Sequence, residues 1–188
     1  VVGSQPFGGE GLSGTGPKAG GPNYLTRFFK PAAAPVATGL WAAKADLAAI
    51  AAQAAAKPST RISERHMPGP TGELNRLSLF SRPPVLCLGP GAALAEAQAK
   101  AVTALGGQSV VAGGEVSPQA LTGLAGISAA LWWGDAEAAR AYAQALAARE
   151  GEIVQLITAQ PDVAHVAHER HLCVDTTAAG GNAALLAG

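Results

Sequence analysis

The sequence is poor in charged residues. Only 14% of its 188 residues are charged, and 13 basic side chains balance 13 acidic ones. A chain without net charge has no long-range field that would attract nucleic acid or an anionic membrane surface. We therefore expect no nucleic-acid partner for this region.

Long apolar runs are missing as well. No stretch of about 18 apolar residues could span a membrane, and the first residues lack the basic and apolar segments of a signal peptide. These features predict a soluble, cytoplasmic protein with no membrane span. The chain begins at Val1 rather than at a methionine, which indicates a piece of a longer polypeptide.

Cysteine is scarce and does not suggest a disulfide framework. The two cysteines, Cys87 and Cys173, lie in the apolar runs VLCL and HLCV. Cysteines in such surroundings behave as small buried hydrophobic residues. The sequence predicts that both are buried free thiols in a reducing compartment.

Glycine, alanine and proline dominate the first half of the chain. Glycine fills 8 of the 22 positions from Gly3 to Tyr24, which predicts a loop without helix or strand period. An Ala/Pro-rich linker follows, with one helix expected at residues 40–57 that packs through Leu40, Leu47 and Ile50. Residues 67–84 read as a linker that ends in an edge strand.

The second half alternates between apolar strands and helices of about a dozen residues. Strands are expected at residues 85–88, 109–112, 127–133 and 152–158. Asp135 is expected to cap one helix and Ser117 a shorter one, while Trp132 and Trp133 are expected in the core. The pattern predicts an α/β fold, a Rossmann-like parallel sheet with flanking helices, preceded by the Gly-rich loop and the linker.

Two motifs are candidates for a ligand site. Gly89 and Gly91 lie between a strand and a helix, where a phosphate cradle belongs, but Leu94 replaces the third glycine. A tight turn is the favoured interpretation, and a nucleotide site is the alternative. His165, His168 and His171 are spaced for a shared helix face, but we favour a solvated turn without metal.

Three further stretches resemble one enzyme family. PFGGEGLSGTGPKAGGPNYL at residues 6–25, MPGPTGELNR at 67–76 and the closing run from His171 resemble proline utilization A, in its long form with an extra C-terminal domain. The family is bifunctional: it combines an FAD-dependent proline dehydrogenase with an NAD-dependent glutamate semialdehyde dehydrogenase. By this resemblance Phe7, with Gly8 and Gly9, would line the semialdehyde site of the parent enzyme.

Residues 130–162 are similar to the cofactor-domain segment of aldehyde dehydrogenases, but they depart from it in their chemistry. The turn that faces the pyrophosphate becomes Gly134, Asp135 and Ala136, and the general base falls on Ala159. No cysteine follows at the spacing of a catalytic thiol. The resemblance implies a degenerate cofactor domain, with no catalytic residue, cofactor or metal in this region and with NAD and FAD bound elsewhere in the parent.

The resemblance implies four parts. They are the end of an aldehyde dehydrogenase catalytic domain (1–30), a linker with one helix (31–84), a non-catalytic aldehyde-dehydrogenase-like domain (85–171) and a docking tail (172–188). The expected docking residues of the tail are Thr176, Thr177, Gly180, Gly181, Asn182, Leu185 and Leu186.

The resemblance also implies a function for the whole region. The tail would pack on the catalytic domains of the same polypeptide, contribute to a homo-oligomer and cover a substrate-channelling cavity. The region alone would be inactive. The alternatives are a nucleotide-binding regulatory domain and a plain subunit-association module.

Overall fold

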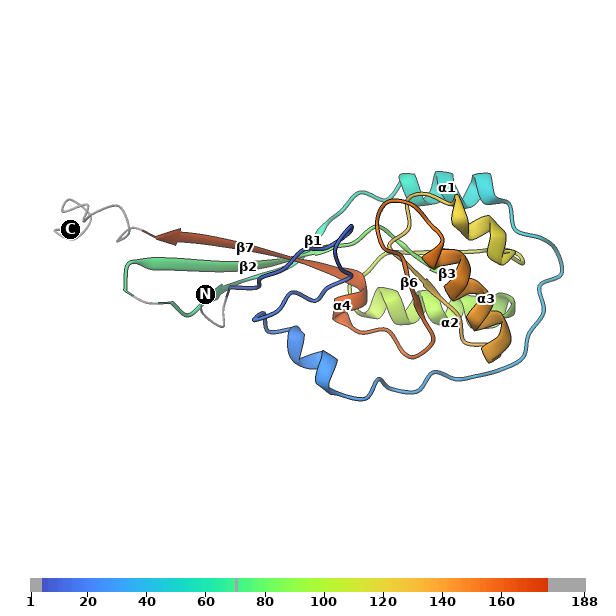
Figure 1. The fold of residues 1–188 in the computed structure, drawn as a ribbon, viewed down its shortest axis with the longest axis horizontal. Helices are drawn as coiled ribbons and strands as arrows, with labels where there is room; N and C mark the ends of the chain where they lie inside the picture. The colour runs from blue at the N-terminus through green and yellow to red at the C-terminus, as the bar shows by residue number, and fades with distance from the viewer. Residues whose placement is uncertain (1–4, 70, 176–188) are drawn as a thin grey trace.

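The computed structural model describes residues 5–69 and 71–175. A four-stranded parallel sheet forms its centre, in the order β4-β3-β5-β6. Its strands are β3 (Val85–Cys87), β4 (Ser109–Val111), β5 (Ala129–Leu131) and β6 (Gln155–Ile157). The predicted Rossmann-like α/β fold is confirmed (Figure 1).

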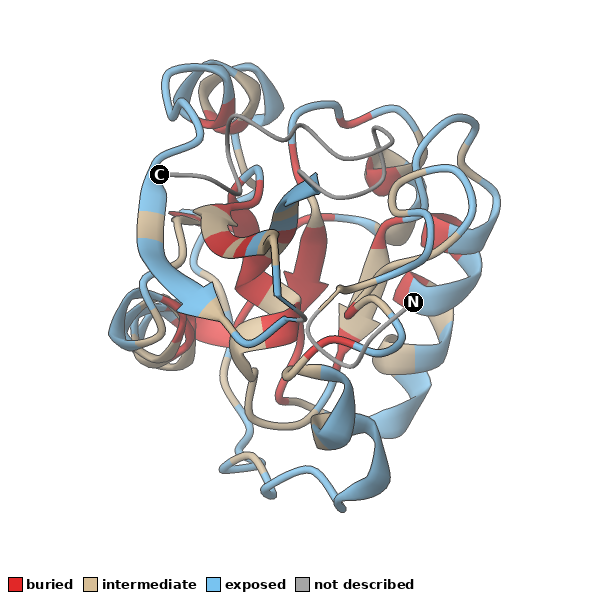
Figure 2. Cartoon of the chain, turned by 90° about the vertical axis from the view of Figure 1, so that its left-hand side faces the viewer, coloured by how far each residue is buried: buried red, intermediate tan, exposed pale blue. Residues whose placement is uncertain are grey.

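Successive side chains of a strand point to opposite faces of the sheet, so these apolar strands have two apolar faces. Helices cover both. Leu86 belongs to one apolar cluster, which also contains residues of α1 (Leu47–Ala55), the 3₁₀ helix η2 (Pro118–Thr122) and α3 (Ala136–Ala147). Val85 and Cys87 belong to the other, together with residues of α2 (Gly91–Ala104) and α4 (Val163–Val166). Buried residues therefore gather on the central strands (Figure 2).

A second sheet, antiparallel and three-stranded, projects from the α/β body (Figure 1). Its order is β1-β2-β7, with β1 at Arg61–Met67, β2 at Glu73–Ser81 and β7 at Ala167–Asp175. The prediction of an edge strand was wrong, because β2 is the central strand. Leu77 pairs with Arg65 on one side and with His171 on the other.

The helix predicted at residues 40–57 begins later than expected. Its first residue is Leu47, because the Asp46 carboxylate accepts hydrogen bonds from the N–H groups of Ala48 and Ala49 at 2.9 and 3.0 Å. Ile50 is buried as predicted, but Leu40 lies outside the helix and is 95% exposed. The expected packing role of Leu40 was therefore wrong, and Leu47, the first residue of the helix, is also exposed.

The two other predicted N-cap residues, Asp135 and Ser117, directly precede their helices. The Asp135 side chain accepts from Ala138 N–H at 2.8 Å and starts α3 as predicted. Ser117 precedes η2, but it makes no side-chain cap hydrogen bond there.

The two cysteines differ in exposure. Cys87 is buried in β3, whereas Cys173 is exposed on β7, so the prediction of two buried thiols holds only for Cys87. Cys173 is exposed because it lies in the part of β7 that projects beyond the body. Trp132 and Trp133 are buried, which confirms their predicted core role.

The Gly-rich segment and the linker wrap the body from outside. η1 (Tyr24–Phe28) follows the Gly-rich loop, and the chain then runs around the body to α1 (Figure 1). Within the described part of the chain, no helix has the length and apolar character needed to cross a membrane.

Candidate functional site

The parallel sheet places one crevice where α/β proteins usually bind ligands. The chain runs from β3 to β4 on one side and to β5 on the other, so the strand order reverses between β3 and β5. Ligands of open α/β sheets bind beyond the carboxyl ends of the strands at such a reversal. A cavity of about 460 Å³ lies there, between Pro90 and Asp135.

The chain's own linker lies across this crevice. The Trp41 indole N–H donates to the Leu88 carbonyl at 3.0 Å, and Ala37 N–H donates to the Trp133 carbonyl at 3.3 Å. A Cβ on Gly39 would stand 2.5 Å from the Pro90 carbonyl oxygen. The linker backbone is thus in direct contact with the turn that sequence analysis considered as a phosphate cradle.

Both backbone polar groups of Gly89 in that turn are already engaged. Gly89 N–H donates to Gln98 Oε1 at 3.0 Å, and the Gln98 amide donates back to the Gly89 carbonyl at 2.8 Å. Gln98 is completely buried. Gly89 and Gly91 have φ values of 95° and 72°, so backbone conformation alone requires glycine here.

The turn after β5, at Gly134 and Asp135, also has partners within the chain. The Trp132 indole N–H donates to the Asp135 carbonyl at 3.0 Å, and a Cβ on Gly134 would lie 2.5 Å from the Trp132 ring. The Asp135 carboxylate caps α3. A negative side chain therefore already occupies the helix N-terminus that a phosphate group would need.

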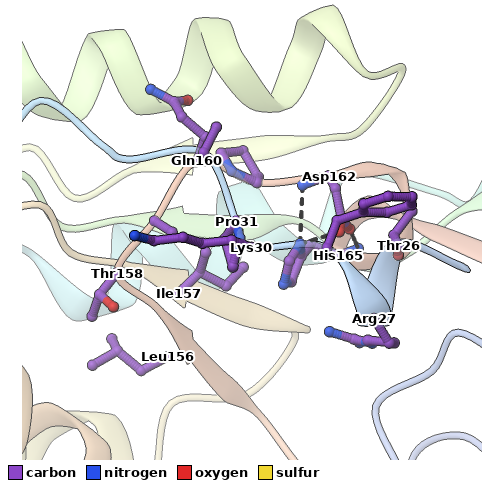
Figure 3. Close-up of a pocket in the computed structure, with 14 residues that line it drawn as sticks. Thr26, Arg27, Lys30, Pro31, Leu156, Ile157, Thr158, Gln160, Asp162 and His165 are labelled. Carbon is purple, nitrogen blue, oxygen red and sulfur yellow. Dashed lines mark hydrogen bonds and ion pairs between the residues drawn. The ribbon is translucent and has the colours of Figure 1, made fainter.

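A second cavity, of about 500 Å³, lies at the carboxyl end of β6 (Figure 3). Ala159 is part of its wall and offers no group for proton transfer. Its one carboxylate, Asp162, lies 2.8 Å from Nδ1 of His165 and caps α4. Burial raises the pKa of Asp162, but the His165 contact and the Ala164 N–H outweigh it and leave that pKa below its usual value.

The same cavity carries positive charge. Arg27 and Lys30 both line it, together with Asp162 and His165 (Figure 3). The Arg27 guanidinium also donates to the Gly16 carbonyl. Among the described lining residues, none is a cysteine or serine that could act as a nucleophile.

The three histidines have separate partners. His165 lies in α4 beside Asp162, while Nδ1 of His168 is 2.7 Å from Glu10 and Nε2 of His171 is 2.8 Å from Asn75. The expected solvated turn was wrong, because His168 and His171 belong to β7. Over residues 5–69 and 71–175, no three His, Cys, Asp or Glu side chains are grouped to hold a metal ion.

The Gly-rich loop displays its single aromatic ring. Phe7 N–H donates to the Ala19 carbonyl at 2.7 Å, and its side chain remains 71% exposed. Gly8 has a φ of 134°, and a Cβ there would meet no atom within 4 Å. The loop is held by Glu10, which forms a buried ion pair with Arg82 at 2.8 Å.

Comparison with known proteins identifies the region. The chain is 35% identical to the bifunctional protein PutA of Escherichia coli (strain K12) over 99% of its length. It is 36% identical to PutA of Salmonella typhimurium over 99% and 32% identical to PutA of Rhizobium meliloti over 100%. The chain is a PutA-related region. The predicted resemblance to proline utilization A is thereby confirmed.

The region is a small part of these PutA proteins. The chain spans 18 to 19% of the length of the three relatives. No protein-family model matches it, and no solved structure matches it.

The structure does not describe some of the predicted site residues of the PutA-related region. The docking residues Thr176, Thr177, Gly180, Gly181, Asn182, Leu185 and Leu186 lie outside the described residues. β7 runs through residue 172 and reaches Asp175. The assignment of residues 172–188 to a docking tail and the other domain boundaries stay predictions.

The groups that organise the PutA-related region were not predicted from the sequence. Arg82 and Glu10 form its buried ion pair, and Gln98 closes the turn after β3. The sequence does single out each member of the ion pair. Glu10 is the one acidic residue among the first 25, and Arg82 directly precedes Pro83-Pro84. Nothing local connects two residues that are 72 positions apart.

Proposed function

We propose that the chain is the C-terminal, non-catalytic part of a bifunctional enzyme that oxidises proline to glutamate. The parent would combine FAD-dependent proline oxidation with NAD-dependent oxidation of glutamate semialdehyde. Similarity to PutA along the whole chain supports this assignment. Phe7, with Gly8 and Gly9, would line the semialdehyde site of the parent.

One observation supports the non-catalytic role above all others. Residues 37–41 form one wall of the crevice at the strand-order reversal, Gln98 engages Gly89 in the turn after β3, and the Asp135 carboxylate caps the helix after β5. A dinucleotide would have to fit the space that the linker leaves and place its phosphates beside a carboxylate. This arrangement argues against the alternative of a nucleotide-binding regulatory domain.

The projecting sheet supports a role in assembly and in covering the channel between the two active sites. Leu74 pairs with Val174 across β2 and β7, and Leu172 lies on the same face two residues earlier. All three are exposed, at 47%, 42% and 45%. Exposed apolar side chains grouped on one face are typical of a surface that another domain covers.

The test is a deletion in the parent enzyme. Removal of residues 172–188 should leave proline oxidation intact and should introduce a lag, or a loss of rate, in proline-driven NADH formation. A reactive aldehyde is retained between two sites only if bulk water is excluded. Unchanged coupled kinetics together with a loss of the oligomer in sedimentation would instead favour a plain subunit-association module.

A further inference from the structure

The Gly-rich loop is not free: it contacts the projecting sheet from Glu73 at the far end to His168 near the base, and it contacts the body at Ile153. We propose that Arg82 and His168 position this loop, so that the α/β region fixes the orientation of Phe7 at the semialdehyde site. The inference rests on the proposed function, which places Phe7 in that site. Arg82 and His168 would act as positioning residues, since they contact the loop and not the substrate.

Arg82 connects the loop to β7 through one guanidinium. Its Nη2 lies 2.8 Å from Glu10 Oε1 and donates to the Thr15 carbonyl at 2.8 Å. Its Nε–H donates to the Ala167 carbonyl at 3.0 Å, at the start of β7. The planar donor set of arginine thus holds two points of the loop and one point of the sheet at fixed relative positions.

The loop closes over this ion pair. The side chains of Arg82 and Glu10 are only 8% and 9% exposed. A Cβ on Gly16 would stand 2.3 Å from Glu10 Oε1 and 2.5 Å from Arg82 Nη2, and Gly16 has a φ of 71°. Glycine at this position is therefore what permits the loop backbone to cover the buried charges.

His168 holds the second oxygen of the same carboxylate. Its Nδ1 is 2.7 Å from Glu10 Oε2. Burial raises the pKa of Glu10, but the His168 hydrogen bond and the Arg82 charge outweigh it and lower that pKa below its usual value. Both carboxylate oxygens of Glu10 therefore have partners, Arg82 directly after β2 and His168 in β7.

Additional contacts fix the loop on both sides of Phe7. Upstream, the Gln5 amide donates to Glu73 Oε1 at 2.7 Å. Downstream, Lys18 N–H donates to the buried Glu169 carboxylate at 2.8 Å, and Ile153 N–H donates to the Gly11 carbonyl at 2.8 Å. Phe7 lies between these anchors with its ring exposed, so the projecting sheet and the body hold the stretch of backbone from which the ring extends.

The expected effect of losing the anchor is specific. Without Arg82, Glu10 becomes a buried carboxylate that lacks its main partner, and the loop should leave its position. A misplaced substrate contact weakens binding of the semialdehyde, so we expect its KM to rise about tenfold. The KM for NAD and the rate of proline oxidation should not change, because neither site includes this loop.

The experiment uses the full-length parent enzyme with four variants. Arg82→Ala removes the anchor, Arg82→Lys retains the charge, Phe7→Ala tests the site, and Arg61→Ala breaks an exposed ion pair with Glu64 in the projecting sheet as the matched control. The semialdehyde KM, its kcat, the NAD KM and proline oxidation are measured for each. We expect Arg82→Ala to behave like Phe7→Ala, Arg82→Lys to recover part of the effect, and Arg61→Ala to match the wild type.

The outcomes separate the inference from the proposed function. If Phe7→Ala raises the semialdehyde KM and Arg82→Ala does not, the positioning role is wrong and the proposed site stands. If Phe7→Ala has no effect, the proposed role of the loop itself is wrong.

A second measurement applies if Arg82→Ala does not fold. Glu10→Gln keeps the shape of the side chain and removes its charge, and Phe7→Trp provides a fluorescent reporter in the full-length enzyme. Increased acrylamide quenching of Trp at position 7 when Glu10→Gln is added would support the anchor. Unchanged quenching would overturn it.

Discussion

The Trp41 indole N–H donates to the carbonyl of Leu88 at 3.0 Å, and this contact joins the linker to the carboxyl end of the parallel sheet. Two backbone hydrogen bonds attach the next linker residues to the body: Ala45 N–H donates to the Glu115 carbonyl, and Glu115 N–H donates to the Ala43 carbonyl, both at 2.9 Å. The linker is therefore an integral part of the α/β body and not a flexible connection.

A first prediction concerns the close approach of the linker to the turn after β3. Gly91→Ala places a Cβ 3.2 Å from the Leu40 carbonyl oxygen at a φ of 72°. We expect it to lower the free energy of unfolding by about 1–3 kcal/mol. Gly113→Ala is the matched control, because Gly113 has a φ of 68° with no atom within 4 Å of its Cβ. Equal losses in denaturant unfolding would contradict a role for the linker contact.

A second prediction concerns nucleotide binding. Because the linker narrows the crevice and the Asp135 carboxylate places negative charge at its edge, calorimetric titration of the region with NAD should give no saturable heat at micromolar cofactor. Trp41→Ala should not create such binding, since Asp135 still opposes the phosphates. Saturable heat with the unmodified chain would support the regulatory nucleotide site instead.

A third prediction concerns pH. The folded state lowers the pKa of Glu10, so Glu10 stabilises the fold above its unfolded pKa, and this contribution is lost as the pH falls through the folded value. Asp162 acts in the same direction, whereas Glu169, whose pKa burial raises, acts in the opposite direction.

The measurement is therefore a difference between two chains. The unfolding free energy of Glu10→Gln and of the wild type should converge as the pH is lowered below the usual carboxylate range. A stability difference that stays constant from neutral to acidic pH would mean that the charge of Glu10 does not stabilise the fold.

A fourth prediction separates the two thiols. Burial raises the pKa of Cys87 to about 12, whereas Cys173 is exposed on β7. A thiol reagent at mildly alkaline pH should modify Cys173 in the folded chain and should reach Cys87 only after unfolding. Cys173→Ser should abolish labelling of the native protein, and rapid labelling of that variant would contradict the burial of Cys87.

The sequence by itself determined the features that depend on neighbouring residues. Apolar runs separated by helical periods indicated the parallel α/β sheet, and Asp135 marked the start of α3. The motif around Phe7 was sufficient to indicate the PutA relationship. Each of these signals is contained in a window of one or two elements, where hydrophobic period and capping chemistry act directly.

Only the tertiary structure decided the features that join distant segments. β2 became a central strand because β7 pairs with it from the other end of the chain, and Cys173 is exposed because it lies in the part of β7 that projects beyond the body. The Glu10–Arg82 ion pair joins residues 72 positions apart. Local propensity carries no information on such contacts, since their stability comes from desolvation and pairing that exist only after the chain has folded.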